Sequence, residues 1–244
     1  MGDIISHHHM PRICEQKLAT VAVCAICKET KSARAMSKHL ETHLKQREEN
    51  KQCSPAFHLR IDGGDDVFWM DVIVPAGASL MMLDRFLRDI WLECCGHLSA
   101  FEIEGRQYNV SFSGLKEMDV FGALDGEETM DIPFGKVLRP GLVFSHDYDF
   151  GTTTTLRLRV ISSGKFGKTK STIELLARNE PPDMRCESCG QKAVVVCSMC
   201  KWNDVESWLC KKCAKKHAGA EDCDGEGFLP VVNSPRVGEC GYTG

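Results

Sequence analysis

Residues 57–92 read FHLRIDGGDDVFWMDVIVPAGASLMMLDRFLRDIWL, and this stretch decides the predicted fold. Phe57, Leu59 and Ile61 alternate with polar residues, which predicts a strand with one buried and one solvent-facing side. A polar turn cluster at 63–66 is followed by the apolar run Val67–Val74, which predicts a second strand. Two strands joined by a glycine-rich turn predict a β-hairpin.

A helix is expected to follow this hairpin. Ser79 can cap a helix that runs to about Leu92. Its apolar residues recur at helical spacing and predict a face packed on a core, whereas four charged residues are expected to face away from it. The apolar positions are Leu80, Leu83, Phe86, Leu87, Ile90 and Trp91, and the charged positions are Asp84, Arg85, Arg88 and Asp89.

Further strands are expected after the helix. Residues 100–103 and 108–112 predict a second hairpin, and residues 142–148 and 153–161 predict a third strand pair. The order of hairpin, helix and more strands predicts an α+β fold. We expect a single sheet with a helix packed on one face, flanked by small zinc-binding modules.

The cysteines divide the chain of 244 residues into three predicted domains, 1–55, 56–179 and 180–244. Most of the 14 cysteines lie in the first and last of these domains. No run approaches the ~20 apolar residues of a membrane helix, and the N-terminus lacks a signal-peptide pattern, so we expect a cytoplasmic protein. In a reducing compartment, paired cysteines bind metal more often than they form disulfides.

Cys24, Cys27, His39 and His43 form the N-terminal candidate metal site. The two cysteines share a tight turn and the histidines are one helical turn apart, so all four can meet one tetrahedral zinc. The pattern resembles the two-Cys, two-His zinc finger, although its spacer is one residue shorter and Lys31 replaces the expected aromatic residue. Fingers of this type bind nucleic acid or protein. Lys28, Lys31, Arg34 and Lys38 are candidate phosphate contacts, or simply a solvated helix face.

The C-terminal domain contains eight further candidate ligands, enough for two tetrahedral zinc ions. They are Cys186, Cys189, Cys197, Cys200, Cys210, Cys213, His217 and Cys223. The order of six cysteines, one histidine and one cysteine resembles the MYND-type finger. That resemblance implies a crossed pairing, in which the first and third cysteine pairs share one ion, and it implies protein binding. Sequential pairing is the alternative. With the N-terminal site, the twelve candidate ligands predict three zinc ions. We expect these ions to be structural, because neither arrangement leaves an open coordination position for catalysis.

The middle of the chain resembles the plasmid pRiA4b ORF-3-like family in 67–78, in the following helix to Trp91, in 98–108 and in 146–151. The Tyr148-Asp-Phe-Gly151 run is the most specific of these stretches. The tail from Leu229 to Tyr242 is similar to that of zinc-bearing members. The resemblance covers 56–162 well and 180–244 moderately. It implies an α+β domain associated with bacterial and archaeal mobile elements, and it implies no established reaction.

No convincing catalytic constellation is present, so we expect no enzyme. Asp147 and Asp149 can pair for acid–base chemistry, but a turn in which Gly151 supplies a positive φ is favoured. Cys94 and Cys95 are interpreted as packing residues at the helix end. The leading hypothesis is a zinc-binding, non-enzymatic adaptor with a protein partner. The alternative is a nucleic-acid-binding accessory factor that uses the basic N-terminal finger. The sequence assigns no role to Cys240 or to the tract at 7–9, and no oligomeric state.

Overall fold

The computed structural model describes residues 20–49, 53–63, 67–110, 128–167, 172–203, 205–219 and 225–244. It divides the chain into two compact units, and each is described by itself. The larger unit lies within Ala19–Pro181 and includes Asn233–Arg236, and the smaller unit contains Pro182–Val232 and Val237–Thr243. The boundary predicted at residue 55 falls inside the larger unit. The tract at 7–9, the turn at 64–66 and Cys223 lie outside the described residues.

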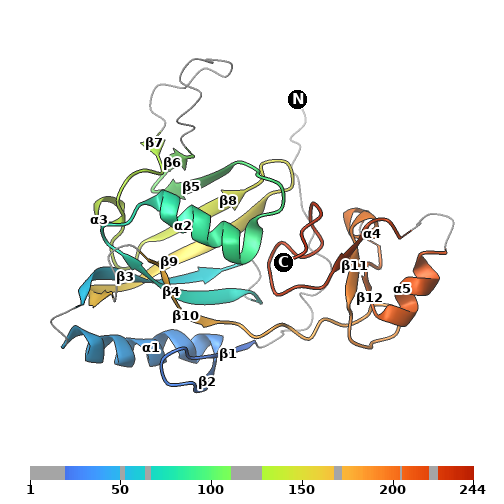
Figure 1. Cartoon of the computed structure of the whole chain (residues 1–244), viewed down its shortest axis with the longest axis horizontal. Helices are drawn as coiled ribbons and strands as arrows, with labels where there is room; N and C mark the ends of the chain where they lie inside the picture. The colour runs from blue at the N-terminus through green and yellow to red at the C-terminus, as the bar shows by residue number, and fades with distance from the viewer. Residues whose placement is uncertain are drawn as a thin grey trace, which may run out of the picture. The chain divides into compact units, whose positions relative to one another are not determined.

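One sheet forms the centre of the larger unit (Figure 1). Among the described residues, eight strands run in the order β10-β4-β3-β9-β8-β5-β6-β7, and all neighbours are antiparallel except β6 and β7. The strands are β3 (Ser54–Asp62), β4 (Trp69–Pro75), β5 (Ser99–Ile103), β6 (Arg106–Asn109), β7 (Glu128–Thr129), β8 (Val143–Tyr148), β9 (Thr154–Gly167) and β10 (Glu174–Arg178). The three predicted strand pairs are therefore present, and the predicted α+β fold is confirmed.

Helix α2 (Leu80–Leu87) and the π-helical turn η2 (Arg88–Leu92) occupy the segment where one helix was predicted. Leu80, Leu83 and Leu87 are buried as expected. Asp84 does not face solvent, because it is 2 % exposed and accepts hydrogen bonds from His146 on β8 and Ser99 on β5. The expectation for Asp84 was wrong because a short carboxylate can be buried where the sheet supplies donors.

The N-terminal module consists of β1 (Val21–Val23), β2 (Thr30–Ser32) and α1 (Ala33–Glu48). It covers the face of the sheet opposite to α2 (Figure 1). Every residue of β4 is buried, which a strand covered on one face only would not show. Met36, Leu40 and Leu44 of α1 share a core with residues of β4, β9 and β10. Arg47 of α1 also donates two hydrogen bonds of 2.9 Å to Glu174 on β10. The N-terminal module and the sheet therefore have a common core.

A turn after β8 differs in detail from the expectation. The positive φ belongs to Asp149 itself, at 66°, and not to Gly151. The Asp149 carboxylate accepts a hydrogen bond of 3.1 Å from the backbone N–H of Gly151. Aspartate tolerates the left-handed region when its side chain bonds the local backbone, so the glycine is not needed for that conformation.

The smaller unit contains β11 (Val195–Cys197), α4 (Ser198–Trp202), β12 (Trp208–Leu209), α5 (Lys211–His217) and β13 (Phe228–Pro230). Its three strands form a sheet in the order β12-β11-β13. One of its hydrophobic clusters is made largely of Leu209, Ala214 and two of the candidate ligands, Cys186 and Cys210. No helix among the described residues is long and apolar enough to cross a membrane.

Candidate metal centres

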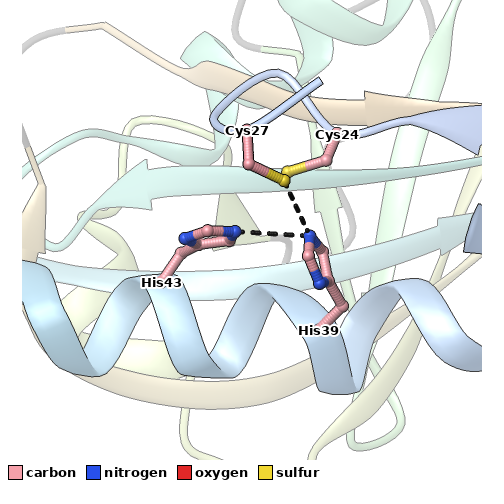
Figure 2. A group of neighbouring side chains, drawn as sticks. All are labelled: Cys24, Cys27, His39 and His43. Atoms are coloured by element: carbon pink, nitrogen blue, oxygen red, sulfur yellow. Dashed lines mark hydrogen bonds between the residues drawn. The ribbon is translucent and has the colours of Figure 1, made fainter. Parts of the chain in front are cut away.

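The N-terminal candidate site joins a turn to a helix. Cys24 and Cys27 lie in the turn after β1, and His39 and His43 are on successive turns of α1 (Figure 2). The turn is closed by a hydrogen bond of 2.9 Å from the N–H of Lys28 to the carbonyl of Cys24, and Lys28 has a φ of 66°. Figure 2 shows all four side chains pointing to one place, and their ligand atoms lie within 4.8 Å of one another.

The spacing of these ligand atoms tests whether they fit a metal ion. Two imidazole nitrogens on a tetrahedral zinc are about 3.4 Å apart, and a nitrogen and a thiolate sulfur are about 3.6 Å apart. The Nε2 atoms of His39 and His43 are 3.3 Å apart, and Nε2 of His39 lies 3.2 Å from Sγ of Cys27. The donor set therefore fits a small tetrahedral cation.

The protonation state of His39 also suits a ligand. Burial is the largest cause that lowers its pKa, and the neighbouring His43 adds to this effect. A lowered pKa keeps the imidazole neutral at neutral pH, and only the neutral ring has a lone pair for a metal.

The C-terminal cysteine pairs meet in the crossed arrangement. Cys186, Cys189, Cys210 and Cys213 have all four sulfur atoms within 4.8 Å of one another. The sulfur atoms of Cys189 and Cys210 are 3.6 Å apart, close to the ~3.8 Å expected for two thiolates on tetrahedral zinc. Gly190 follows the first pair with a φ of 73°, and its N–H donates to the carbonyl of Cys186 at 2.8 Å. Cys210 is the N-cap residue of α5.

The thiols of this cluster differ in pKa. A hydrogen bond from the backbone N–H of Cys213 lowers the pKa of the Cys210 thiol to about 7. A hydrogen bond with Cys189 is the largest cause that raises the pKa of the Cys213 thiol to about 12. Several thiolates cannot crowd together unless a cation balances them, and a divalent metal supplies that charge.

The second C-terminal group contains Cys197, Cys200 and His217. Cys197 is the N-cap residue of α4, and His217 is the last residue of α5. The Sγ of Cys200 lies 3.2 Å from the Nε2 of His217, and the imidazole stacks on Phe228 with ring centroids 5.8 Å apart. The predicted fourth ligand, Cys223, lies outside the described residues. The structure thus groups eleven of the twelve predicted ligands into three sets.

Sequence reasoning missed a further group, which in the larger unit includes Cys94, Cys95 and His97. Cys94 is partly exposed and Cys95 is exposed, so core packing does not explain them. Adjacent cysteines followed by a histidine do not match the spacing of a zinc knuckle, which is why the sequence analysis passed over them. The concentration of three metal-binding side chains within four residues was the available signal.

The two candidate carboxylates have separate hydrogen-bond partners. Asp147, on β8, accepts a hydrogen bond of 2.6 Å from the hydroxyl of Thr155. Asp149 lies beyond the end of β8, is 5 % exposed, and accepts a hydrogen bond of 2.5 Å from Arg236. Each carboxylate therefore has a partner that fixes its position.

No family model matches this chain, and no curated protein matches it. One solved structure, a protein of unknown function from Methanosarcina mazei Go1, matches with a TM-score of 0.36 and 15 % sequence identity. The match covers 51 % of this chain and 65 % of that protein.

Proposed function

We propose that this protein is a zinc-stabilised, non-enzymatic interaction protein whose smaller unit binds an acidic segment of a partner protein. The observation that carries the proposal is a basic hollow of about 750 Å³ on that unit. Its lining includes one exposed apolar residue, Val194, and five cationic side chains. The cations are Arg185, Lys192, Lys211, Lys212 and Lys215.

The charge of this hollow suits an acidic ligand. Lys211, Lys212 and Lys215 lie on the short helix α5 and are exposed. No ion pair between these three lysines and an acidic side chain is present among the described residues. A positive surface of this kind attracts acidic partners and increases the rate of association.

The unit also presents apolar surface that a protein partner can cover. Met199 is 61 % exposed, Trp202 is 69 % exposed and Val205 is 56 % exposed. Met199 and Trp202 are three residues apart on α4. Protein interfaces are enriched in tryptophan and methionine, so these side chains favour a protein ligand over free phosphate.

Zinc is the proposed metal because cysteine and histidine are its usual ligands in structural sites. The three predicted sets account for three ions when Cys223 completes the third. Two of the ligands, Cys186 and Cys210, pack in a hydrophobic cluster of the smaller unit, so metal binding there would contribute to its folding free energy. In this proposal the ions build the binding surface and perform no chemistry.

The remaining parts of the proposal follow from the same features. In the two complete sets, four protein ligands leave no coordination position for a substrate, and Asp147 and Asp149 each have a hydrogen-bond partner, which supports a non-enzymatic role. Reduced cysteines in metal sets favour a cytoplasmic location. Membership of the pRiA4b ORF-3-like family, and through it an association with mobile elements, is part of the proposal on the sequence motifs alone.

Selection of random twelve-residue peptides against the full chain tests the proposal. We expect the selected peptides to be rich in Asp and Glu with an interspersed apolar residue. The Lys211→Glu/Lys215→Glu variant should lose their binding at least tenfold, because two attractive charges become repulsive. Lys136→Glu, an exposed lysine of the larger unit, is the control and should bind normally. Peptides without acidic residues, or equal binding by both variants, would contradict the proposal.

Nucleic-acid binding through the N-terminal module is the second candidate function. Arg34, Lys38 and Lys45 are exposed and spaced four and seven residues apart, so they follow one side of α1. Lys31 is already paired with Glu29 at 2.8 Å and is a weaker candidate.

A salt series with a twenty-base-pair DNA duplex separates this function from protein binding. If α1 binds phosphates, log K should fall steeply with log salt concentration, and Lys38→Gln should reduce that slope by about one. The Lys136→Gln variant should leave the slope unchanged. A salt-independent or undetectable affinity would exclude this second function.

A further inference from the structure

The end of helix η2 brings two adjacent cysteines and a histidine together. The sulfur atoms of Cys94 and Cys95 are 3.7 Å apart, and Sγ of Cys95 lies 2.9 Å from Nε2 of His97. Gly96 has a φ of 79°, a conformation that glycine adopts readily, and it turns the chain so that His97 comes back towards the cysteines. The N–H of Gly96 also donates to the Glu93 carboxylate at 2.5 Å.

We propose that Cys94, Cys95 and His97 form a further metal site that binds a divalent cation preferring thiolate and imidazole ligands, with zinc as the expected ion. This site is separate from the three sets predicted from the sequence. Its three side chains supply three of the four positions of a tetrahedral zinc. The 3.7 Å between the two sulfur atoms agrees with the ~3.8 Å edge of a tetrahedral zinc thiolate site.

The orientation of His97 is the second observation that points to a metal. While its Nε2 faces the sulfur of Cys95, its Nδ1 lies 3.4 Å from the carboxylate of Asp149. A carboxylate behind a histidine fixes the ring and makes its other nitrogen a better ligand, an arrangement that recurs in zinc sites. Asp149 is itself held at 2.5 Å by Arg236 and at 3.1 Å by the N–H of Gly151.

Arg236 lies beside Cys94, the first cysteine of this group. Its side chain is fully buried, and its Nη2 donates to Sγ of Cys94 at 3.5 Å. Further hydrogen bonds of 3.0 Å to the carbonyl of Thr152 and the hydroxyl of Thr154 fix the guanidinium. A fixed positive group beside a sulfur favours the thiolate, which is the form that binds metals.

A disulfide between the adjacent cysteines is the competing explanation. A disulfide requires sulfur atoms about 2.05 Å apart, whereas these are 3.7 Å apart.

Native mass spectrometry of the full-length, zinc-loaded protein tests this site by difference. The Cys95→Ser and His97→Gln variants should each bind one zinc fewer than the unaltered protein. Cys53→Ser is the matched control, because Cys53 belongs to none of the clusters formed by the described residues, and it should keep every zinc. An unchanged zinc count in both cluster variants would overturn the proposal.

Alkylation of the unaltered protein keeps the test independent of any folding defect in the variants. Cys94 and Cys95 are accessible enough to react, so zinc should protect both, and a chelator should expose them. Equal alkylation with and without zinc, or a Cys94–Cys95 disulfide in peptide mass mapping, would overturn the proposal. Asp149→Asn should weaken zinc binding at this site about 10–100-fold in chelator competition.

Discussion

Replacement of Cys213 by serine is expected to unfold the smaller unit while the larger unit remains folded. Cys213 shares a cluster with Cys186, Cys189 and Cys210, so a lost ligand opens a site that joins two segments of the unit far apart in sequence. Structural zinc contributes about 10–16 kcal/mol of binding free energy in zinc-finger peptides, which is as large as the ~5–15 kcal/mol net stability of a typical domain. Amide hydrogen exchange should show lost protection in 182–232 and retained protection in β3 and β4.

Thiol mapping of the same variant tests the crossed pairing. Cys186 and Cys189 should become reactive although Cys197 and Cys200, which belong to the other ligand set, lie between them and the substitution. The Cys53→Ser control, which removes a thiol outside the clusters, should leave both the protection and the thiol reactivity unchanged. If Cys186 and Cys189 stayed protected in Cys213→Ser, the four sulfur atoms would not share an ion.

The ligand sets were the part of the site that sequence could predict. A Cys-x2-Cys pair, or two histidines four residues apart, fixes which side chains converge, because the spacing is local. Spacing does not determine which distant pairs share an ion. The crossed and sequential groupings use the same eight residues, and only the fold of the unit places Cys186 beside Cys210.

The group at Cys94, Cys95 and His97 was missed for a related reason. The groups that contact its side chains come from residues far along the chain, because Asp149 lies behind the histidine and Arg236 lies beside the first cysteine. No pattern within the segment around Cys94 predicts such a site. Adjacent cysteines at the end of an amphipathic helix therefore look like packing residues until the turn at Gly96 is known.

The sheet shows the same limit in its strands. Alternation in β3 predicted the strand and its hairpin partner correctly, and the register pairs Leu59 with Val72. The polar side of the strand was expected to face solvent, but His58, Arg60 and Asp62 are all buried. Helix α1 covers that side, and a helix contributed by a predicted separate module cannot be foreseen from the strand's own pattern.

Removal of Arg60 tests how much this covered polar layer contributes to stability. Arg60 is 8 % exposed and donates hydrogen bonds of 2.9 Å to Asp62 and to Asp71, which itself is fully buried. Its guanidinium also lies 4.0 Å from the ring centroid of Trp69. Loss of one partner from a buried ion pair leaves an uncompensated charge, so Arg60→Ala should reduce the free energy of unfolding of the larger unit by about 3–5 kcal/mol.

A double-mutant cycle in urea, with zinc held in excess, identifies the source of this loss. Asp71→Ala should also destabilise the unit, since Asp71 accepts hydrogen bonds from Ser37 and His58 as well as from Arg60. The double variant Arg60→Ala/Asp71→Ala should lose less than the sum of the single variants, because neither charge is then left without its counterpart. Arg139→Ala, which breaks an exposed pair with Glu104, is the control and should leave stability unchanged. Additive losses of unfolding free energy, or a stable Arg60→Ala variant, would contradict this prediction. Either result would mean that water reaches this polar layer and that α1 does not exclude it from that face of the sheet.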